Sequence, residues 1–231
     1  MPPEIAIKDL PHPFFKAILF DMDGTLVDTE PYWLVCETEL MDEFGYAWTV
    51  QDQSNCLGGP LSKVGEYMHS LARYEETPEF FTNALVDRMV DKLKSGVALM
   101  QGAQSLLNLC MDLGIPIALV SASPRVLVDA AISDIRNVDF RISISSDDVT
   151  RVKPDPEGYL KAAEFLGVDI STCLVLEDSA NGVTSAKASG AWVVAIPHLV
   201  PIQESERVAT VSSVEILTLD YLDSLYKRWH S

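Results

Sequence analysis

The feature that most constrains the fold of this 231-residue chain is a set of five short, strongly apolar runs. Each is too short and too apolar for a surface helix, which is typical of a strand buried on both faces. Helical patterns separate the later runs, and Gly114, Gly167 and Gly190 follow three of these patterns, where a left-handed C-cap favours glycine. The alternation predicts an α/β fold with a doubly wound parallel sheet. The expected strands are 17–20, 115–120, 140–145, 173–176 and 192–196, and the expected helices are 103–113, 125–135, 156–166 and 180–189.

The stretch from about residue 31 to residue 96 breaks this alternation. It contains helical patterns near residues 32–45, 61–74 and 78–95 and no clear strand pattern. The segments at its two ends, TLVDTEP and SGVALMQG, are short and carry Pro or Gly, as expected where an insert leaves its parent domain. We therefore expect a helical domain at 31–96, inserted into an α/β core domain formed by 1–30 and 97–231. The tail from about residue 208 should add a short strand and a closing helix.

Charge and composition exclude several classes of partner. The chain has 34 acidic and 17 basic residues, a net charge of −17, which disfavours nucleic acids and anionic membrane surfaces. No window approaches the ~18 consecutive apolar residues of a membrane helix, and the N-terminus lacks a secretory pattern, so a cytoplasmic location is expected. The four cysteines form no C-x-x-C pair and are expected to be reduced and mostly buried. A monomer is the simplest expectation.

Polar side chains follow four of the expected strands. DMDGT (21–25) follows the first, SASPR (121–125) the second and EDS (177–179) the fourth, while KPDP (153–156) lies several residues beyond the third. Taken singly, each has an ordinary alternative, such as an aspartate turn, a helix N-cap, a surface turn or an acidic helix start. In an open parallel sheet, however, ligands bind outside the carboxyl ends of the strands. We therefore expect these four segments to converge on one site.

The side chains of these segments suit phosphoryl transfer. Mg²⁺ prefers hard oxygen ligands and commonly takes one or two carboxylates, which Asp21 and Asp178 can supply together with a backbone carbonyl from Asp23. Lys153 and the metal would neutralise phosphoryl oxygens, and Ser121 with the backbone N–H groups after it would donate hydrogen bonds. The expected ligand is a small phosphorylated metabolite, and the expected cofactor is Mg²⁺.

Together, the motifs DMDGT, SAS, KPDP and EDSANG, in this order, resemble those of the haloacid dehalogenase-like (HAD) phosphatases. The resemblance spans residues 17 to 197. It implies that Asp21 is a nucleophile that forms an aspartyl-phosphate and that Asp23 is a general acid and base. The inserted helical domain corresponds to the small α-helical cap of this family, which closes over the site.

The resemblance also assigns residues around the two aspartates. Glu177 supports the metal ligands or the lysine without itself binding the metal. The metal group is Asp21, Asp23 and Asp178, and the phosphate-binding group is Ser121, Ala122, Lys153, Gly24 and Thr25.

The substrate class depends on the cap. The stretch DTEPYW (28–33) is similar to bacterial sugar-phosphate phosphatases that act on 2-deoxyglucose-6-phosphate and hexitol phosphates, within the β-phosphoglucomutase-like subfamily. Mutases resemble DTAEYH there, so Trp33 replaces a histidine, and the segment 57–64 lacks the mutase arginine, although Lys63 is a partial substitute. We expect Glu30, Trp33 and Lys63 to shape the leaving-group pocket. Trp33 has a plain alternative as a packing residue.

The leading hypothesis is a Mg²⁺-dependent phosphomonoesterase for small sugar or polyol phosphates. The alternatives are a β-phosphoglucomutase-like phosphosugar mutase and a phosphoglycolate-type phosphatase. A catalytically silent binding protein is a further alternative from a different class, disfavoured because Asp21, Asp23 and Asp178 are all present.

Overall fold

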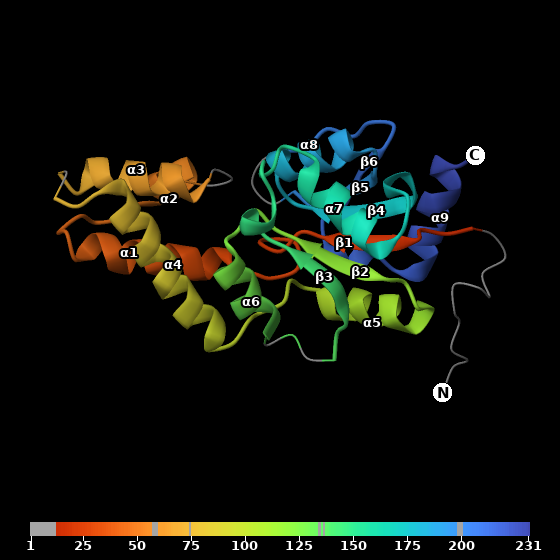
Figure 1. Cartoon of the computed structure of the whole chain (residues 1–231), viewed down its shortest axis with the longest axis horizontal. Helices are drawn as coiled ribbons and strands as arrows, with labels where there is room; N and C mark the ends of the chain where they lie inside the picture. Colours follow the sequence, from red (N-terminus) through yellow and green to blue (C-terminus); the bar gives the residue numbers. More distant parts are fainter. Residues whose placement is uncertain (1–12, 57–59, 74, 134, 136, 198–200) are drawn as a thin grey trace.

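A six-stranded parallel sheet forms the centre of the computed structural model, which describes residues 13–231 except 57–59, 74, 134, 136 and 198–200 (Figure 1). The strand order is β3-β2-β1-β4-β5-β6, so β1 lies near the middle of the sheet. The strands are β1 (Ala17–Phe20), β2 (Ile117–Val120), β3 (Phe140–Ile144), β4 (Cys173–Glu177), β5 (Trp192–Ala195) and β6 (Val208–Thr210). The doubly wound parallel sheet expected from the sequence is confirmed.

Helices cover both faces of the sheet because both faces are apolar. The helices are α5 (Ala103–Leu113), α6 (Arg125–Ser133), α7 (Glu157–Leu166), α8 (Ala180–Ser189) and α9 (Leu219–Trp229). Ile18 and Phe20 of β1 point to the side packed by α5, α6 and α9, whereas Ala17 and Leu19 point to the side packed by α7 and α8. This alternation explains why the strands are continuous apolar runs rather than half-polar ones.

The C-terminal tail forms β6 and α9, as the sequence predicts. The expected strand at 115–120 is shorter, because β2 begins at Ile117, and the expected helix at 125–135 ends at Ser133 in α6. Within the described part of the chain, no helix combines the length and apolar character that a bilayer crossing requires. All four cysteines are free thiols, and only Cys56 is not fully buried.

Four helices lie between β1 and α5, to one side of the sheet (Figure 1). They are α1 (Glu30–Asp42), α2 (Val50–Cys56), α3 (Leu61–Leu71) and α4 (Pro78–Lys94). The sequence predicts three of them but not α2, because its seven residues, VQDQSNC, are too polar and too few for an apolar period to show. The helix α4 packs against α6 of the sheet-bearing part. Boundaries of 31–96 for a separate cap domain remain a prediction.

The two segments that join these helices to the sheet lie side by side. The backbone N–H of Asp28 donates to Ala98 O at 2.8 Å, and that of Met100 donates to Leu26 O at 2.9 Å. Val27 and Leu99 form an antiparallel bridge between them. The helical insert therefore leaves and re-enters the core at adjacent positions, directly beyond the end of β1.

Candidate active site

The loop after β1 places two aspartates at the carboxyl end of the sheet. Asp21 directly follows the strand, and its backbone N–H donates to Leu176 O of β4 at 3.0 Å. Gly24 has φ +78, and a Cβ built on it would lie 2.5 Å from Oδ2 of Asp178. Glycine therefore serves both the left-handed turn and the close approach of a second carboxylate. A side chain at position 24 would therefore clash with Asp178, the residue that follows β4.

Lys153 joins the carboxylates of two strands. Its ammonium donates to Oδ1 of Asp21 at 2.5 Å, to Oε1 of Glu177 at 2.7 Å and to the backbone O of Val120 at 2.7 Å. An ammonium has three N–H donors, so all three are used. Burial lowers the pKa of Lys153, but the charges of Asp21 and Glu177 outweigh this effect and raise the pKa overall. Lys153 therefore stays a cation in a buried position.

Glu177 is completely buried and is held from several directions. The hydroxyl of Tyr159, also fully buried, donates to Oε1 at 2.8 Å, and the Lys153 ammonium lies 5.0 Å from the centre of the Tyr159 ring. Ser179 Oγ and the backbone N–H groups of Asp178 and Ser179 donate to Oε2 at 3.1 to 3.3 Å. These donors hold Glu177 in place, and Glu177 in turn holds Lys153; its supporting role in the reaction remains a prediction.

Three carboxylates lie close together at this edge, and Lys153 is bonded to two of them. One oxygen from each of Asp21, Glu177 and Asp178 lies within 4.8 Å of the others. Burial raises the pKa of Asp21 well above its usual value; Glu177 adds to the shift and Lys153 partly opposes it. Burial, followed by the charge of Glu177, raises the pKa of Asp178 to about 7. The cluster therefore has more negative charge than its lysine balances, and it would be stabilised by a further cation.

The donor set fits Mg²⁺. Carboxylate oxygens are hard ligands, and Mg²⁺ is commonly held by one or two of them. The oxygens of Glu177 are already occupied by Lys153, Tyr159 and Ser179, so Asp21 and Asp178 are the more available ligands. The side chain of Asp23, a predicted member of the metal group, lies outside this cluster, and its expected contribution is a backbone carbonyl.

Asp23 faces a second group, made of hydroxyls. Thr29 Oγ1 donates to its Oδ1 at 2.8 Å, and Ser123 Oγ donates to its Oδ2 at 2.8 Å. Ser121 Oγ is 3.4 Å from the same Oδ2 and accepts a hydrogen bond from the backbone N–H of Ser123 at 2.9 Å. The two aspartates of the DMDGT motif thus have different surroundings, one beside a lysine and one among neutral donors.

Sequence reasoning missed Ser123, Thr29 and Tyr159 at the site. The second serine of SAS and the threonine of DTEP both belong to quoted motifs, so their proximity to a carboxylate was a usable signal. Tyr159 had no such signal, because its position on α7 matches that of an ordinary apolar core residue.

The remaining predicted site residues do not all lie beside the cluster of Asp21, Glu177 and Asp178. Thr25 Oγ1 is 3.5 Å from Oδ1 of Asp178, and Ala122 is exposed in the loop after β2. Glu30 and Trp33 are half-buried near the start of α1, and Trp33 packs against the apolar core. Lys63 is exposed on α3, and the described contacts do not bring it to the other site residues.

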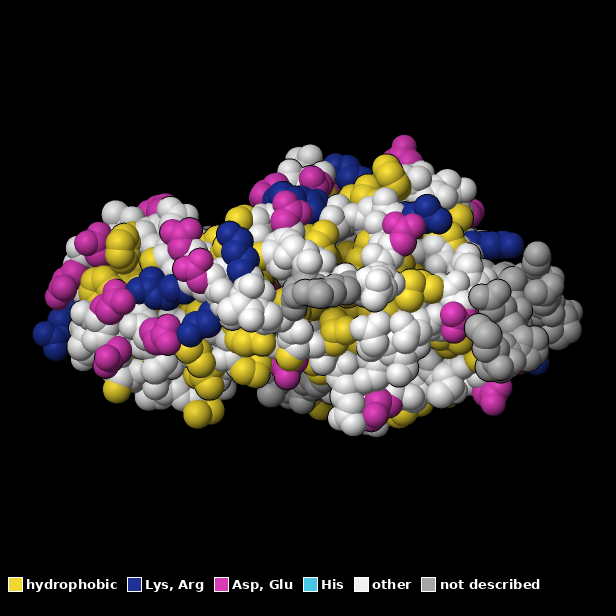
Figure 2. Space-filling model, turned by 90° about the horizontal axis from the view of Figure 1, so that it is seen from below, with side chains coloured by type: hydrophobic (Ala, Val, Ile, Leu, Met, Phe, Trp, Pro, Cys, Tyr) yellow, Lys and Arg dark blue, Asp and Glu magenta, His cyan; other side chains and the backbone are white. Residues whose placement is uncertain are grey.

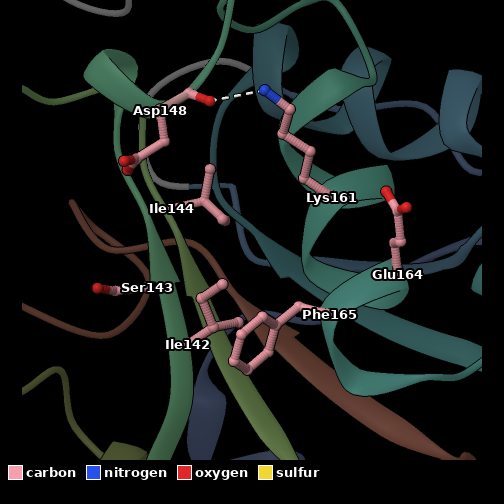
Figure 3. Close-up of a pocket in the computed structure, with 7 residues that line it drawn as sticks. All are labelled: Ile142, Ser143, Ile144, Asp148, Lys161, Glu164 and Phe165. Atoms are coloured by element: carbon pink, nitrogen blue, oxygen red, sulfur yellow. Dashed lines mark hydrogen bonds between the residues drawn. The ribbon is translucent and has the colours of Figure 1, made fainter.

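A groove of about 480 Å³ lies elsewhere, between the edge strand β3 and α7 (Figure 3). Ile142 and Phe165 face each other across it, and Lys161 Nζ donates to the backbone O of Asp148 at 2.7 Å. None of the carboxylates at the carboxyl end of β1 or β4 lines it. The groove is therefore separate from the candidate active site.

Comparison with known proteins places this geometry in a family. A family model described as haloacid dehalogenase-like hydrolase matches residues 18–196. The chain belongs to the haloacid dehalogenase-like hydrolase family. The Bacillus subtilis protein YhcW is 32% identical over 217 residues, covering 90% of this chain and 98% of that protein. Hexitol phosphatase B of Escherichia coli K12 is 29% identical over 185 residues, covering 78% of this chain and 83% of that protein.

Two solved structures share the fold. β-Phosphoglucomutase from Clostridium difficile superposes with a TM-score of 0.77 at 20% identity, covering 94% of this chain and 99% of that chain. CbbY from Rhodobacter sphaeroides, in complex with phosphate, gives 0.74 at 24% identity and covers 91% and 100%. The family predicted from DMDGT, SAS, KPDP and EDSANG is confirmed, as is the enzyme class of phosphoric monoester hydrolase.

Proposed function

We propose that this HAD-family enzyme is a Mg²⁺-dependent phosphatase that hydrolyses small sugar or polyol phosphates through an aspartyl-phosphate on Asp21. The observation that carries the proposal is the arrangement of the two aspartates. Asp21 is held by Lys153 through Oδ1, and Asp23 is held among hydroxyl groups two residues later. One carboxylate is thus fixed beside a cation and the other beside donors that can exchange protons.

Asp21 is suited to the role of nucleophile. Lys153 takes only its Oδ1, and among the described residues no hydrogen bond is made to Oδ2. Attack by Oδ2 on phosphorus forms the Asp21–phosphate bond as the bond from phosphorus to the ester oxygen breaks. Lys153 keeps Asp21 oriented, while Ser121 and the backbone N–H groups after it can bind phosphoryl oxygens. Because all three N–H groups of Lys153 are occupied, a phosphoryl oxygen must replace one of its present partners.

Asp23 is suited to proton transfer. Its protonated form gives a proton to the departing alkoxide oxygen, and its ionised form then takes a proton from the water that hydrolyses the aspartyl-phosphate. The products are the free alcohol and inorganic phosphate. Thr29 and Ser123 hold the carboxyl group from two sides, which orients it for both steps.

Asp21 and Asp178 would hold Mg²⁺, with the backbone carbonyl of Asp23 as a third ligand. When bound, the ion would supply positive charge to the phosphoryl oxygens and to the acidic cluster. Glu177 supports these ligands indirectly, because its carboxylate holds the ammonium of Lys153.

The proposed substrate class rests on the relatives and on the cap. Hexitol phosphatase B supports a polyol phosphate, and Glu30 and Trp33, half-buried near the start of α1, support a partly polar leaving-group pocket. The exposed position of Lys63 lends no support to a second phosphate subsite of the kind that a mutase needs. Figure 2 shows Lys and Arg side chains interspersed with acidic ones over the helical insert, so the face in view has no continuous basic surface for a polyanionic partner.

The test is phosphate release from a panel of sugar, polyol and short-acid phosphates, with Asp21→Asn alongside. We expect Mg²⁺-dependent release that is abolished by EDTA and by the Asp21→Asn variant. Release that persists in the variant would refute the nucleophile assignment. Interconversion of glucose 1-phosphate and glucose 6-phosphate without net phosphate release would instead indicate a mutase.

A further inference from the structure

One buried carboxylate, that of Glu37, takes no part in the proposed phosphatase reaction. Glu37 lies in α1 and is only 4% exposed. The other buried acidic groups among the described residues are Asp21, Glu177 and Asp52. The first two belong to the active site. Asp52 is satisfied by its surroundings, because it accepts hydrogen bonds from Thr49, from the hydroxyl of Tyr67 at 2.6 Å and from that of Tyr46.

Glu37 is satisfied far less well. Within the described part of the chain, its one hydrogen bond comes from Trp48, whose Nε1 is 3.1 Å from Oε2, and Oε1 has no partner. Burial raises the pKa of Glu37 to about 7; the bond from Trp48 lowers it in part, and the charge of Glu30 raises it further. A buried carboxylate with a single neutral donor is costly to the fold. Its presence is better explained by a ligand than by packing.

The position of Glu37 points to the leaving-group side of the active site. It follows Glu30 by seven residues and Trp33 by four, so the three side chains share one face of α1. This face starts directly after Thr29, the residue that holds Asp23. Glu37 lies about 10 Å further along the helix axis.

A second element approaches Glu37 from the other side. The negative charge of Glu37 is close enough to raise the pKa of the Cys56 thiol, after the larger effect of burial. Cys56 is the last residue of α2. Trp48, which lies between α1 and α2 in the chain, provides an aromatic surface beside the carboxylate. Glu37 therefore lies close to both Trp48 and the end of α2.

We propose that Oε1 of Glu37 accepts a hydrogen bond from a hydroxyl group of the leaving group, which makes this side chain the determinant that selects polyhydroxylated phosphate esters. The inference rests on the proposed phosphatase function. A mostly buried carboxylate binds a hydroxyl strongly, because the bond is charge-assisted and few water molecules reach the side chain. The indole surfaces of Trp33 and Trp48 can pack against the C–H groups of a polyol at the same time.

The experiment compares Glu37→Gln with the wild type on two esters of six carbons, glucitol 6-phosphate and hexyl phosphate. The amide keeps the size of the side chain and its bond to Trp48 but lacks the charge. We expect kcat/KM for glucitol 6-phosphate to fall about 10- to 100-fold, mainly through KM, and that for hexyl phosphate to change less than about twofold. Glu39→Gln is the matched control, since Glu39 lies on the same helix, is exposed, and is expected to leave both substrates unchanged.

An equal loss on both esters would overturn the proposal, because it would show a general effect on the cap. A selective loss for an amino-sugar phosphate, with glucitol 6-phosphate unaffected, would also overturn it and indicate recognition of an ammonium group. Binding of both esters is measured by calorimetry in the Asp21→Asn background, where turnover is not needed. If no ester is hydrolysed by the wild type but Glu37 still controls the preference for glucitol 6-phosphate, the proposed function fails and the inference stands.

Discussion

Replacing Glu37 with glutamine should stabilise the protein, and the gain should depend on pH. In the unfolded chain the carboxyl group has a pKa of 4.5, whereas burial raises it to about 7 in the fold. Below pH 4.5 the group is protonated in both states and imposes no charge penalty. As the pH rises from 4.5 to 7, the unfolded chain loses the proton first, so the stability of the fold decreases. Above pH 7 both states are ionised and the loss is constant.

The size of the effect follows from the two pKa values. Raising the pKa from 4.5 to about 7 corresponds to about 3 kcal/mol at 1.36 kcal/mol per pKa unit, most of which develops between pH 5 and pH 8. Because Glu37 is 4% exposed, water screens little of this penalty. The groups that act on the pKa of Glu37 besides burial are the donor Trp48 and the charge of Glu30, so no cation offsets the penalty. Glutamine keeps the bond from Trp48 without the charge.

The assay is urea or thermal unfolding of the wild type, Glu37→Gln and Glu39→Gln at pH 5, 6, 7 and 8. Relative to the wild type, Glu37→Gln should gain about 2 to 3 kcal/mol between pH 5 and pH 8, equivalent to about 5 to 10 °C in Tm for a chain of this size. Glu39→Gln, which changes an exposed group, should give a constant difference. A Glu37→Gln difference that is the same at pH 5 and pH 8 would refute the reasoning. A stabilised variant that also loses selectivity would show that the carboxylate serves binding at the expense of stability.

Three further predictions concern the active site. Tyr159→Phe removes a hydrogen bond to a buried carboxylate, so it should lower the free energy of unfolding by about 1.5–3 kcal/mol and also lower kcat. Tyr67→Phe removes a similar bond within the helical insert and should lower only the free energy of unfolding. Gly24→Ala should lower the free energy of unfolding by about 1–2 kcal/mol because of its positive φ, and it should also displace Asp178 and lower activity. Gly45 also has a positive φ, +67, but open space around it, so Gly45→Ala should lower only the free energy of unfolding, as measured by a denaturation curve. Mg²⁺ should raise the Tm of the wild type, EDTA should reverse the rise, and Asp178→Asn should weaken it in a thermal-shift titration.

Much of the fold was predictable because the strands are buried on both faces. AILF, IALV, CLVLE and WVVA have no polar residue except Glu177 at a strand end, so each is recognisable without tertiary information. The glycines after α5, α7 and α8 mark the helix ends, where the structure has left-handed caps at Gly114, Gly167 and Gly190. These signals are local, and the chain positions them independently of distant contacts.

The helix α2 and the surroundings of the aspartates were not predictable in the same way. The single fully buried side chain of α2 is Asp52, which is held by hydroxyls from Tyr46, Thr49 and Tyr67, so a hydrophobic pattern is absent. At the active site, DMDGT and KPDP identify Asp21, Asp23 and Lys153 as neighbours. They do not show that the Lys153 ammonium donates to three different acceptors, because that depends on how α7 and β4 pack.

The paired segments beyond β1 also bear on how such a chain can be rearranged. Asp28 and Ala98 are linked by one hydrogen bond, and Leu26 and Met100 by another, so about seventy residues enter and leave the sheet through a single two-stranded stem. Beyond this stem the insert contacts the sheet-bearing part through α4 and α6, so we expect a helical unit of another size to be accepted when it keeps that contact. The helical insert would then be exchanged as one piece, while the strands that lead to Asp21 and Asp178 stay in place.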